Sequence, residues 1–299
     1  MRKLIILAVV GFAAQLVDGS LGMGYGVTSS SLLILAGLTP AAASASVHFS
    51  ELGTNIASGL SHWKLKNVDW RVVARVAGPG AIGAFLGATV LSTLSTEAAA
   101  PIMSAILALL GAYVLARFVI GFVPPKFKKQ ISLKFLAPLG LFAGFIDATG
   151  GGGWGPVATP ALLADGRLEP RKVIGSVDTS EFAVSAAASL GFLLGLGAAG
   201  INWGFALALL IGGLLAAPLA AILVKYAPTH LLGVAVGGVI LLTNSRTLLK
   251  SFGVPADARW WVYGAILIVT LAGLYVAAMR AKKRAEVSAG SETEATINA

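Results

Sequence analysis

Long apolar runs separated by short polar stretches make up most of the chain. Seven of these runs approach the roughly 20 residues that an α-helix needs to cross a bilayer, and they fall at 42–61, 72–94, 98–120, 173–199, 202–224, 230–249 and 260–279. Apolar runs of this length are typical of membrane spans. The pattern therefore predicts an all-α integral membrane protein.

Two further apolar segments of about 30 residues each contain a glycine-rich interruption. The interruptions read DGSLGMGYG at 18–26 and DATGGGGWG at 147–155, and both fit the pattern D-x-[ST]-x-G-x-G-[YW]-G. About 30 residues further on, the match resumes with SVHFSE at 46–51 and SVDTSE at 176–181. This self-similarity in the same order indicates two homologous halves.

The interrupted segments predict a hairpin at the start of each half. Each segment is too long for one straight span, at about 1.5 Å per residue, and too short for two full spans. We therefore expect a re-entrant hairpin of two half-helices, followed by three spans. Irregular backbone at membrane depth must be buried in protein or line a wet cavity, because lipid offers its polar groups no partner. Each glycine break is thus expected to line a site.

The distribution of Lys and Arg favours an inverted second half. With one hairpin and three spans in each half the number of crossings is odd, which places 17 of the 22 basic residues on one side and 5 on the other. Parallel halves would give a split of 14 to 8. Because cytoplasmic loops carry the excess of Lys and Arg, we predict two inverted repeats plus one extra C-terminal span. The N-terminus then lies outside and the C-terminus in the cytoplasm.

Composition supports the membrane assignment and argues against several classes of function. Apolar residues make up 57% of the 299 residues and charged residues 12%, and the mean hydropathy is +0.85. Cysteine is absent, which excludes disulfides and thiolate metal sites. The net charge of +9 lies in loops and tails, where it sets topology rather than binding nucleic acid. No nucleophile–base motif or cofactor fingerprint occurs, so we expect no enzyme activity, catalytic residue, metal site or cofactor.

These patterns divide the chain into five parts. They are a first repeat at 1–120, a cytoplasmic linker at 121–133, a second repeat at 134–250, an extra transmembrane helix at 251–280 and a disordered polar tail at 281–299. The tail is predicted to be disordered because it is polar and contains few apolar residues. Small residues line many of the spans, which is compatible with a homo-oligomer as well as with packing inside one chain.

The paired glycine motifs, each followed by Pro40 or Pro170 and then by S-V-x-x-S-E, resemble the sulfite exporter TauE/SafE family of membrane permeases. The resemblance covers about residues 5–277. It implies a multi-pass protein of the bacterial inner membrane that moves sulfite or related sulfur-containing anions and organosulfonates. Members of the family differ in substrate, so the resemblance points to a class of substrate rather than to one compound.

The same segments suit an oxyanion. The second arm of each hairpin is expected to begin beside the glycine break, and the free N–H groups and partial positive charge of a helix N-terminus attract anions. Hydroxyl groups donate further hydrogen bonds to sulfite oxygens. The substrate-binding candidates are therefore Gly24, Tyr25, Gly26, Ser46, Ser50, Gly153, Trp154, Gly155, Ser176, Thr179 and Ser180. The competing interpretation is that these small residues serve only close helix packing.

Ionisable residues inside apolar segments are costly and mark function. Asp18 and Asp147 stand in the breaks, where each is expected to cap the second half-helix. The candidates for coupling or gating are His48, Glu51, Asp178 and Glu181. His48 and Asp178 occupy equivalent positions in the two halves, so a pseudo-twofold axis is expected to bring them together as a proton switch. The alternative is a buried, hydrogen-bonded histidine unrelated to coupling.

Together these features predict a secondary transporter that exports sulfite by rocking one repeat against the other, with protons as the coupling ion. Its expected partners are a small sulfur oxyanion, protons and the lipid bilayer. Two other classes stay open. One is an ion channel in which the hairpins form a selectivity constriction. The other is a cation or metal permease with Asp18, Asp147, Glu51 and Glu181 as ligands, although the lack of a clustered His/Cys set argues against soft metals.

Overall fold

The computed structural model describes residues 2–121, 132–165, 167–223 and 229–297, and within these ranges it contains helices and no strands. The helices are α1 Arg2–Leu21, α2 Tyr25–Leu35, α3 Pro40–Lys64, α4 Trp70–Thr93, α5 Thr96–Ile120, α6 Leu133–Gly150, α7 Trp154–Asp165, α8 Pro170–Leu196, the short 3₁₀ helix η1 Ala198–Gly200, α9 Trp203–Leu223, α10 Thr229–Ser251 and α11 Ala256–Ile297. The predicted all-α fold is confirmed. The linker predicted at 121–133 lies mostly outside the described residues.

Polar residues in the short connections define where several helices begin. The Thr39 hydroxyl accepts a hydrogen bond from the Ala42 N–H at 3.3 Å, just before the proline that opens α3. Asp69 and Ser95 cap α4 and α5 in the same way. Each cap satisfies an N–H group that has no partner inside its helix.

Six of the described helices are long and apolar enough to cross a membrane: α4, α5, α6, α8, α9 and α11. Central helix α3 has 25 residues but carries many polar ones, including buried serines, a histidine and a glutamate. Such a helix must turn these side chains toward the protein interior, since lipid offers them no partner.

The hairpin arms are unequal, which corrects the expectation of two half-helices. The first arms, α1 and α6, have 20 and 18 residues, whereas the second arms, α2 and α7, have 11 and 12. At 1.5 Å per residue the first arms measure about 27–30 Å, close to a full bilayer core. The run before the second motif contains Pro138, but α6 continues through it to Gly150, so the break falls at the glycine motif in both halves.

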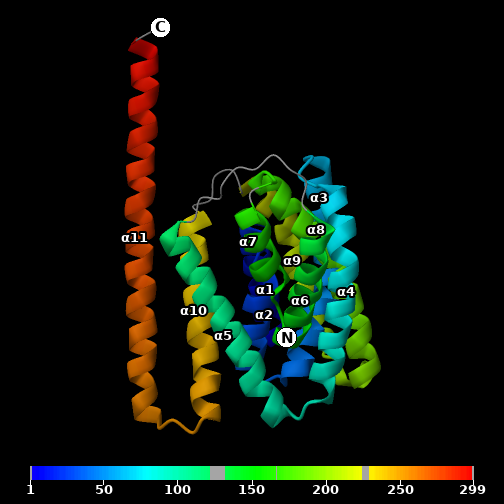
Figure 1. Cartoon of the computed structure of the whole chain (residues 1–299). Coiled ribbons are helices and arrows are strands. Elements are labelled where there is room, and N and C mark those ends of the chain that lie inside the picture. Colours follow the sequence, from blue (N-terminus) through cyan, green and yellow to red (C-terminus); the bar gives the residue numbers. More distant parts are fainter. Residues whose placement is uncertain (1, 122–131, 166, 224–228, 298–299) are drawn as a thin grey trace.

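Helices of the two halves are interleaved rather than packed as two separate bundles (Figure 1). α1 packs along α9, α6 packs along α4, and α5 packs along α10. The two helices that carry the S-V-x-x-S-E motif, α3 and α8, contact each other in the interior. By the sequence repeat α1 corresponds to α6 and α9 to α4, so the first two pairings are one contact that occurs twice. The inversion of the halves in the membrane stays a prediction.

The last helix continues into the segment predicted to be a disordered tail, and the disorder stays a prediction. α11 runs as one helix to Ile297 and projects well beyond the bundle (Figure 1). Residues 281–286 are Ala, Lys, Arg and Glu, which favour a helix, whereas the later part of the segment also contains Gly290 and several Ser and Thr residues, which favour it less.

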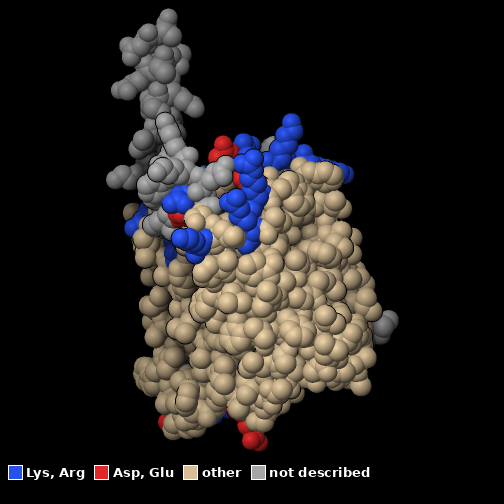
Figure 2. Space-filling model, turned by 45° about the vertical axis from the view of Figure 1, so that its right-hand side comes forward, with Lys and Arg blue, Asp and Glu red and all other residues tan. Residues whose placement is uncertain are grey.

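Basic side chains gather at one end of the bundle, as Figure 2 shows. That end includes the connection between α3 and α4, the end of α5 and the starts of α6 and α8 (Figure 1). Lys64, Arg71, Lys134, Arg171 and Lys172 belong to these helix ends.

Candidate functional site

The two glycine breaks cross each other inside the bundle. A Cβ atom on Gly26 would lie 2.8 Å from the Gly152 Cα, and one on Gly155 would lie 2.7 Å from the Met23 Cα. Gly152 also has a φ of 145°, a region that side chains rarely allow. Glycine is therefore required here for two separate reasons, close backbone contact and backbone conformation.

Two hydrogen bonds join the hairpins on either side of this crossing. The Ser30 hydroxyl donates to the Gly151 carbonyl, and the Thr159 hydroxyl donates to the Gly22 carbonyl at 2.7 Å. Ser30 and Thr159 each lie 12 residues after the aspartate of their own motif. The two bonds are thus equivalent contacts exchanged between the halves.

Asp18 and Asp147 each accept a hydrogen bond from the first residue of the following helix. The Tyr25 N–H lies 3.3 Å from Asp18 Oδ1, and the Trp154 N–H lies 3.0 Å from Asp147 Oδ1. Both carboxylates are buried. They occupy part of the positive helix N-terminus that the sequence pattern assigned to the substrate.

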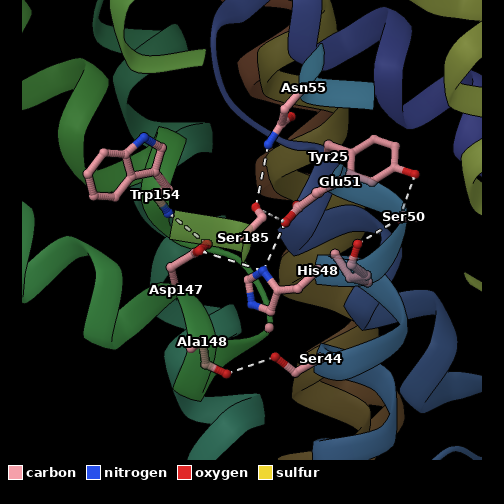
Figure 3. Close-up of polar contacts among 12 residues, drawn as sticks. Tyr25, Ser44, His48, Ser50, Glu51, Asn55, Asp147, Ala148, Trp154 and Ser185 are labelled. Carbon is pink, nitrogen blue, oxygen red and sulfur yellow. Dashed lines mark hydrogen bonds and ion pairs between the residues drawn. The ribbon is translucent and has the colours of Figure 1, made fainter. Parts of the chain in front are cut away.

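His48, Glu51 and Asp147 form one buried group, which we call the histidine cluster (Figure 3). His48 Nδ1 lies 2.9 Å from Glu51 Oε2 and 3.8 Å from Asp147 Oδ2. The imidazole ring also stacks on Phe192, with 5.9 Å between the ring centres. The cluster joins α3 of the first half to the glycine break of the second half.

Several polar atoms of the histidine cluster have no hydrogen-bond partner among the described residues: His48 Nε2, Glu51 Oε1 and Asp147 Oδ2. Ser185 supports the glutamate from α8 by donating to Glu51 Oε2 at 3.0 Å. Asn55 in turn donates to the Ser185 hydroxyl at 3.4 Å (Figure 3). Buried polar atoms without partners are costly, so these three atoms are available to a ligand, a proton or water.

Asp18, Asp178 and Glu181 form a second buried group, which we call the acid cluster. One carboxylate oxygen from each residue lies within 4.8 Å of the others. The three residues are at most 9% exposed. This cluster joins α8 of the second half to the glycine break of the first half.

The expected pairing of His48 with Asp178 is wrong. His48 contacts Glu51 and Asp147, whereas Asp178 lies with Asp18 and Glu181. Side chains three residues apart share one face of a helix, and that face of α3 or α8 turns toward the hairpin of the opposite half. His48 therefore lies beside the glycine break of the second half and Asp178 beside that of the first half, and the two residues do not pair.

Tyr25 and Trp154, the aromatic residues of the two glycine motifs, pack inside the protein. Trp154 is fully buried, and its indole N–H donates to the Val177 carbonyl at 3.0 Å. The Tyr25 hydroxyl lies 3.0 Å from the Ser50 hydroxyl (Figure 3). Gly80 leaves room for the Trp154 ring, and the equivalent Gly213 faces Thr54 and the edge of the Tyr25 ring. The two aromatic residues thus occupy equivalent places but bind different partners.

Most hydroxyls proposed for the substrate bond to backbone groups. Ser46, Thr179 and Ser180 donate to carbonyls of their own helices. Ser50 also donates to the Val47 carbonyl at 2.7 Å. Ser176 accepts from the Asp69 N–H at 2.8 Å, which ties α8 to the start of α4. Among the predicted serines, Ser50 is hydrogen-bonded to a residue of a glycine motif, the Tyr25 hydroxyl.

The structure adds residues that the sequence pattern did not single out. Ser30 and Thr159 bind the opposite break, and Ser185 and Asn55 support Glu51. The repeat contained a signal for the first two, because both stand at the same distance after the motif aspartate. Asn55 and Ser185 are also equivalent polar positions, each four residues after the glutamate of its motif, but their contact depends on how α3 and α8 pack.

A helical bundle with two broken hairpins crossing at buried charged clusters defines a membrane protein of the transporter class. Comparison with known proteins agrees. Residues 7–247 match the model of the family described as "Sulfite exporter TauE/SafE", and the chain belongs to this family. It is also 51% identical over 276 residues to "Probable membrane transporter protein YtnM" of Bacillus subtilis (strain 168), covering 92% of each chain. No solved structure matches.

Proposed function

We propose that this transporter exports sulfite or another small sulfur-containing anion by alternating access, with protons as a coupling ion. The observation that carries the proposal is the histidine cluster, where an imidazole and two carboxylates are buried together beside the crossing of the breaks. With a neutral imidazole the two carboxylates repel an anion. A protonated imidazole offsets one of their charges, so uptake of a proton favours binding of the anion.

The crossing supports an anion site next to this cluster. Helices α2 and α7 both begin there, and a helix N-terminus carries N–H groups and partial positive charge. Asp18 and Asp147 take up one N–H each, which leaves the other N–H groups of the first turns. The unpartnered His48 Nε2 supplies a further donor when the ring is protonated.

The interleaved packing supports alternating access. Each hairpin crosses the other and contacts a central helix of the opposite half. If the repeats are inverted, an exchange of their conformations opens the crossing to one side and closes it to the other. The gathering of basic residues at one end of the bundle favours that end as the cytoplasmic one (Figure 2).

The test is sulfite flux into or out of proteoliposomes, with and without an imposed pH gradient. We expect saturable flux that the gradient accelerates, and we expect His48→Gln to remove the acceleration. The exposed Asp257→Asn is the matched control, since Asp257 lies in the first turn of α11, outside both clusters. Sulfite flux that is absent under every gradient, while organosulfonates move, would transfer the proposal to those anions.

A further inference from the structure

A groove on the outer surface of the bundle lies between α10, α11 and the end of α2, and we call it the α10–α11 groove. Its volume is about 460 Å³, and its walls include Leu242 of α10, Leu267 of α11 and Leu35 of α2. Farther along the two helices, Thr270 of α11 packs on Gly238 of α10. The groove therefore opens between the ends of α10 and α11 that are joined by a short connection (Figure 1).

The α10–α11 groove is polar at its mouth and apolar in its depth. Arg246 lies near the joined ends of the helices, and Leu242 lies one turn deeper, by about 6 Å. Trp260 lies at a similar level on α11, and Leu267 lies about 10 Å deeper. The rings of Trp260 and Tyr263 pack edge to face, with 5.8 Å between their centres. Because Trp and Tyr are enriched at the level of lipid head groups, this order of side chains matches a phospholipid, with its charged head above its acyl chains.

The charge at the mouth of the groove suits an anionic head group. Arg246 is exposed, and no acidic side chain among the described residues forms an ion pair with it. The joined helix ends, residues 246–260, also carry Lys250 and Arg259 against one acid, Asp257. Arginine donates paired hydrogen bonds to phosphate oxygens. The groove thus places a phosphate-binding side chain directly above an apolar slot.

The second repeat arm has an equivalent groove, so the feature does not depend on α11 alone. This groove, of about 630 Å³, lies between α5 and α7, which correspond by the repeat to α10 and α2. Tyr113 lines it, and Tyr113 and Arg246 occupy equivalent positions when counted from the starts of α4 and α9. Arg117, one turn nearer the end of α5, donates to the Tyr113 hydroxyl at 3.4 Å. Helix α11, which lies outside the repeat, adds a third wall to the α10–α11 groove.

We propose that the α10–α11 groove binds an anionic phospholipid, with its phosphate on Arg246 and an acyl chain along Leu242 and Leu267. An α-helix with its side chains is about 10 Å across, so a groove of this volume holds only about one turn of a partner helix. A flexible acyl chain, in contrast, can follow the groove along its length. Because Leu35 ends α2, the lipid also joins α11 to the hairpin of the first half.

The test is photolabelling of the purified full-length protein in phosphatidylcholine vesicles. The vesicles contain a trace of phosphatidylglycerol or of phosphatidylcholine that carries a photoreactive group on one acyl chain, and labelled residues are mapped by mass spectrometry of peptides. We expect the phosphatidylglycerol probe to label residues 242–246 and 260–267 more strongly than other lipid-facing segments. It should also label them more strongly than the phosphatidylcholine probe does.

Two variants address the two parts of the lipid separately. Gly264→Leu should lower labelling in the groove by about fivefold or more, because the new side chain fills space that the acyl chain needs. A Cβ on Gly264 meets nothing within 4 Å, so this variant should fold. Gly78→Leu is its matched control, since Gly78 is exposed on α4 and also has open space around it. Arg246→Gln should lower labelling by phosphatidylglycerol about fivefold, whereas the exposed Arg2→Gln should leave it unchanged.

Other occupants of the groove give different results. Uniform labelling of all lipid-facing helices would overturn the site. Equal labelling by the two probes, or labelling that Arg246→Gln leaves unchanged, would overturn recognition of an anionic head group. Displacement of the probe by inorganic phosphate would assign Arg246 to a free anion instead of a lipid. The chain contains no cysteine, so disulfide cross-linking of two chains through Gly264→Cys would show that a second copy covers the groove. None of these measurements depends on anion flux, so failure here and failure of the proposed function are distinguishable.

Discussion

The histidine cluster and the acid cluster are built from equivalent positions and differ in charge. In each, a central helix of one half meets the glycine break of the other half, and the break contributes an aspartate that also binds the first N–H of the next helix. One substitution between the halves, His48 against Asp178, gives the first cluster a group that can become positive. The second cluster has carboxylates only.

The difference separates a common scaffold from side chains that have diverged between the halves. The backbone contacts at the crossing are the same in both halves, so the scaffold is common. The side chains facing that scaffold are free to diverge, because the crossing does not depend on them. Under the proposed function the histidine cluster binds protons beside the anion, and the acid cluster, built from carboxylates, is free to take another role.

The largest effect is expected from Gly152→Ala, which removes the scaffold on which both clusters depend. The new Cβ would overlap the Val27 nitrogen, at a φ of 145°. Strain and overpacking together should lower the free energy of unfolding by about 3 kcal/mol or more. Unfolding in detergent with increasing SDS measures this loss.

Gly37→Ala is the matched control for that variant. Gly37 has a φ of 97°, but a Cβ there would meet nothing within 4 Å. It therefore reports backbone strain without the clash. Equal losses in the two variants would show that close contact at the crossing contributes nothing.

The second prediction compares His48→Asp with Asp178→His. His48→Asp makes both clusters purely acidic, so sulfite flux should fall by more than about tenfold, since three neighbouring buried carboxylates repel an anion. Asp178→His gives both clusters a protonatable ring, so flux should persist with an altered dependence on pH. Flux measured from about pH 5.5 to about 8 in proteoliposomes checks both.

The double variant His48→Asp/Asp178→His sharpens the comparison further. If the two clusters are interchangeable, it should recover much of the flux that His48→Asp loses. Recovery would mean that only the presence of one histidine matters. No recovery would mean that the anion site belongs to the side of the crossing on which His48 lies.

A third, smaller effect is expected where the breaks are capped. Asp147→Ala removes the acceptor for the Trp154 N–H and should destabilise the protein by about 2 kcal/mol, the upper end for loss of a helix cap, because this acceptor is buried. Asp147→Asn keeps an acceptor oxygen and should keep most of that stability. If Asp147→Asn nevertheless lowers flux as strongly as Asp147→Ala does, the charge beside His48 serves transport rather than folding. Chemical denaturation and flux, measured on the same preparations, separate the two contributions.

Features set by local sequence could be predicted from these residues, and features set by distant packing could not. The repeat located both breaks and both aspartates, because residues seven apart, such as Asp18 and Tyr25, meet wherever the chain turns back. The sequence pattern pairs His48 with the wrong residue, because the environment of His48 depends on how α3 is rotated against α6. The sequence pattern also fails to predict the unequal lengths of the hairpin arms, because glycine composition indicates that a helix breaks but not how far it has run by then.

The smallest effects are expected at the two hydrogen bonds that clamp the crossing. Ser30→Ala removes the donor to the Gly151 carbonyl, and Thr159→Val removes the donor to the Gly22 carbonyl. Each change should cost about 1 kcal/mol of stability, because a buried carbonyl loses its partner. The double variant tests whether the crossing is one unit. Since the hairpins are in direct contact, its loss should differ from the sum of the single losses by about 0.5 kcal/mol or more. Strict additivity in SDS unfolding would mean that the two hairpins move independently. The two clusters would then have no common scaffold through which protonation of one could affect the other.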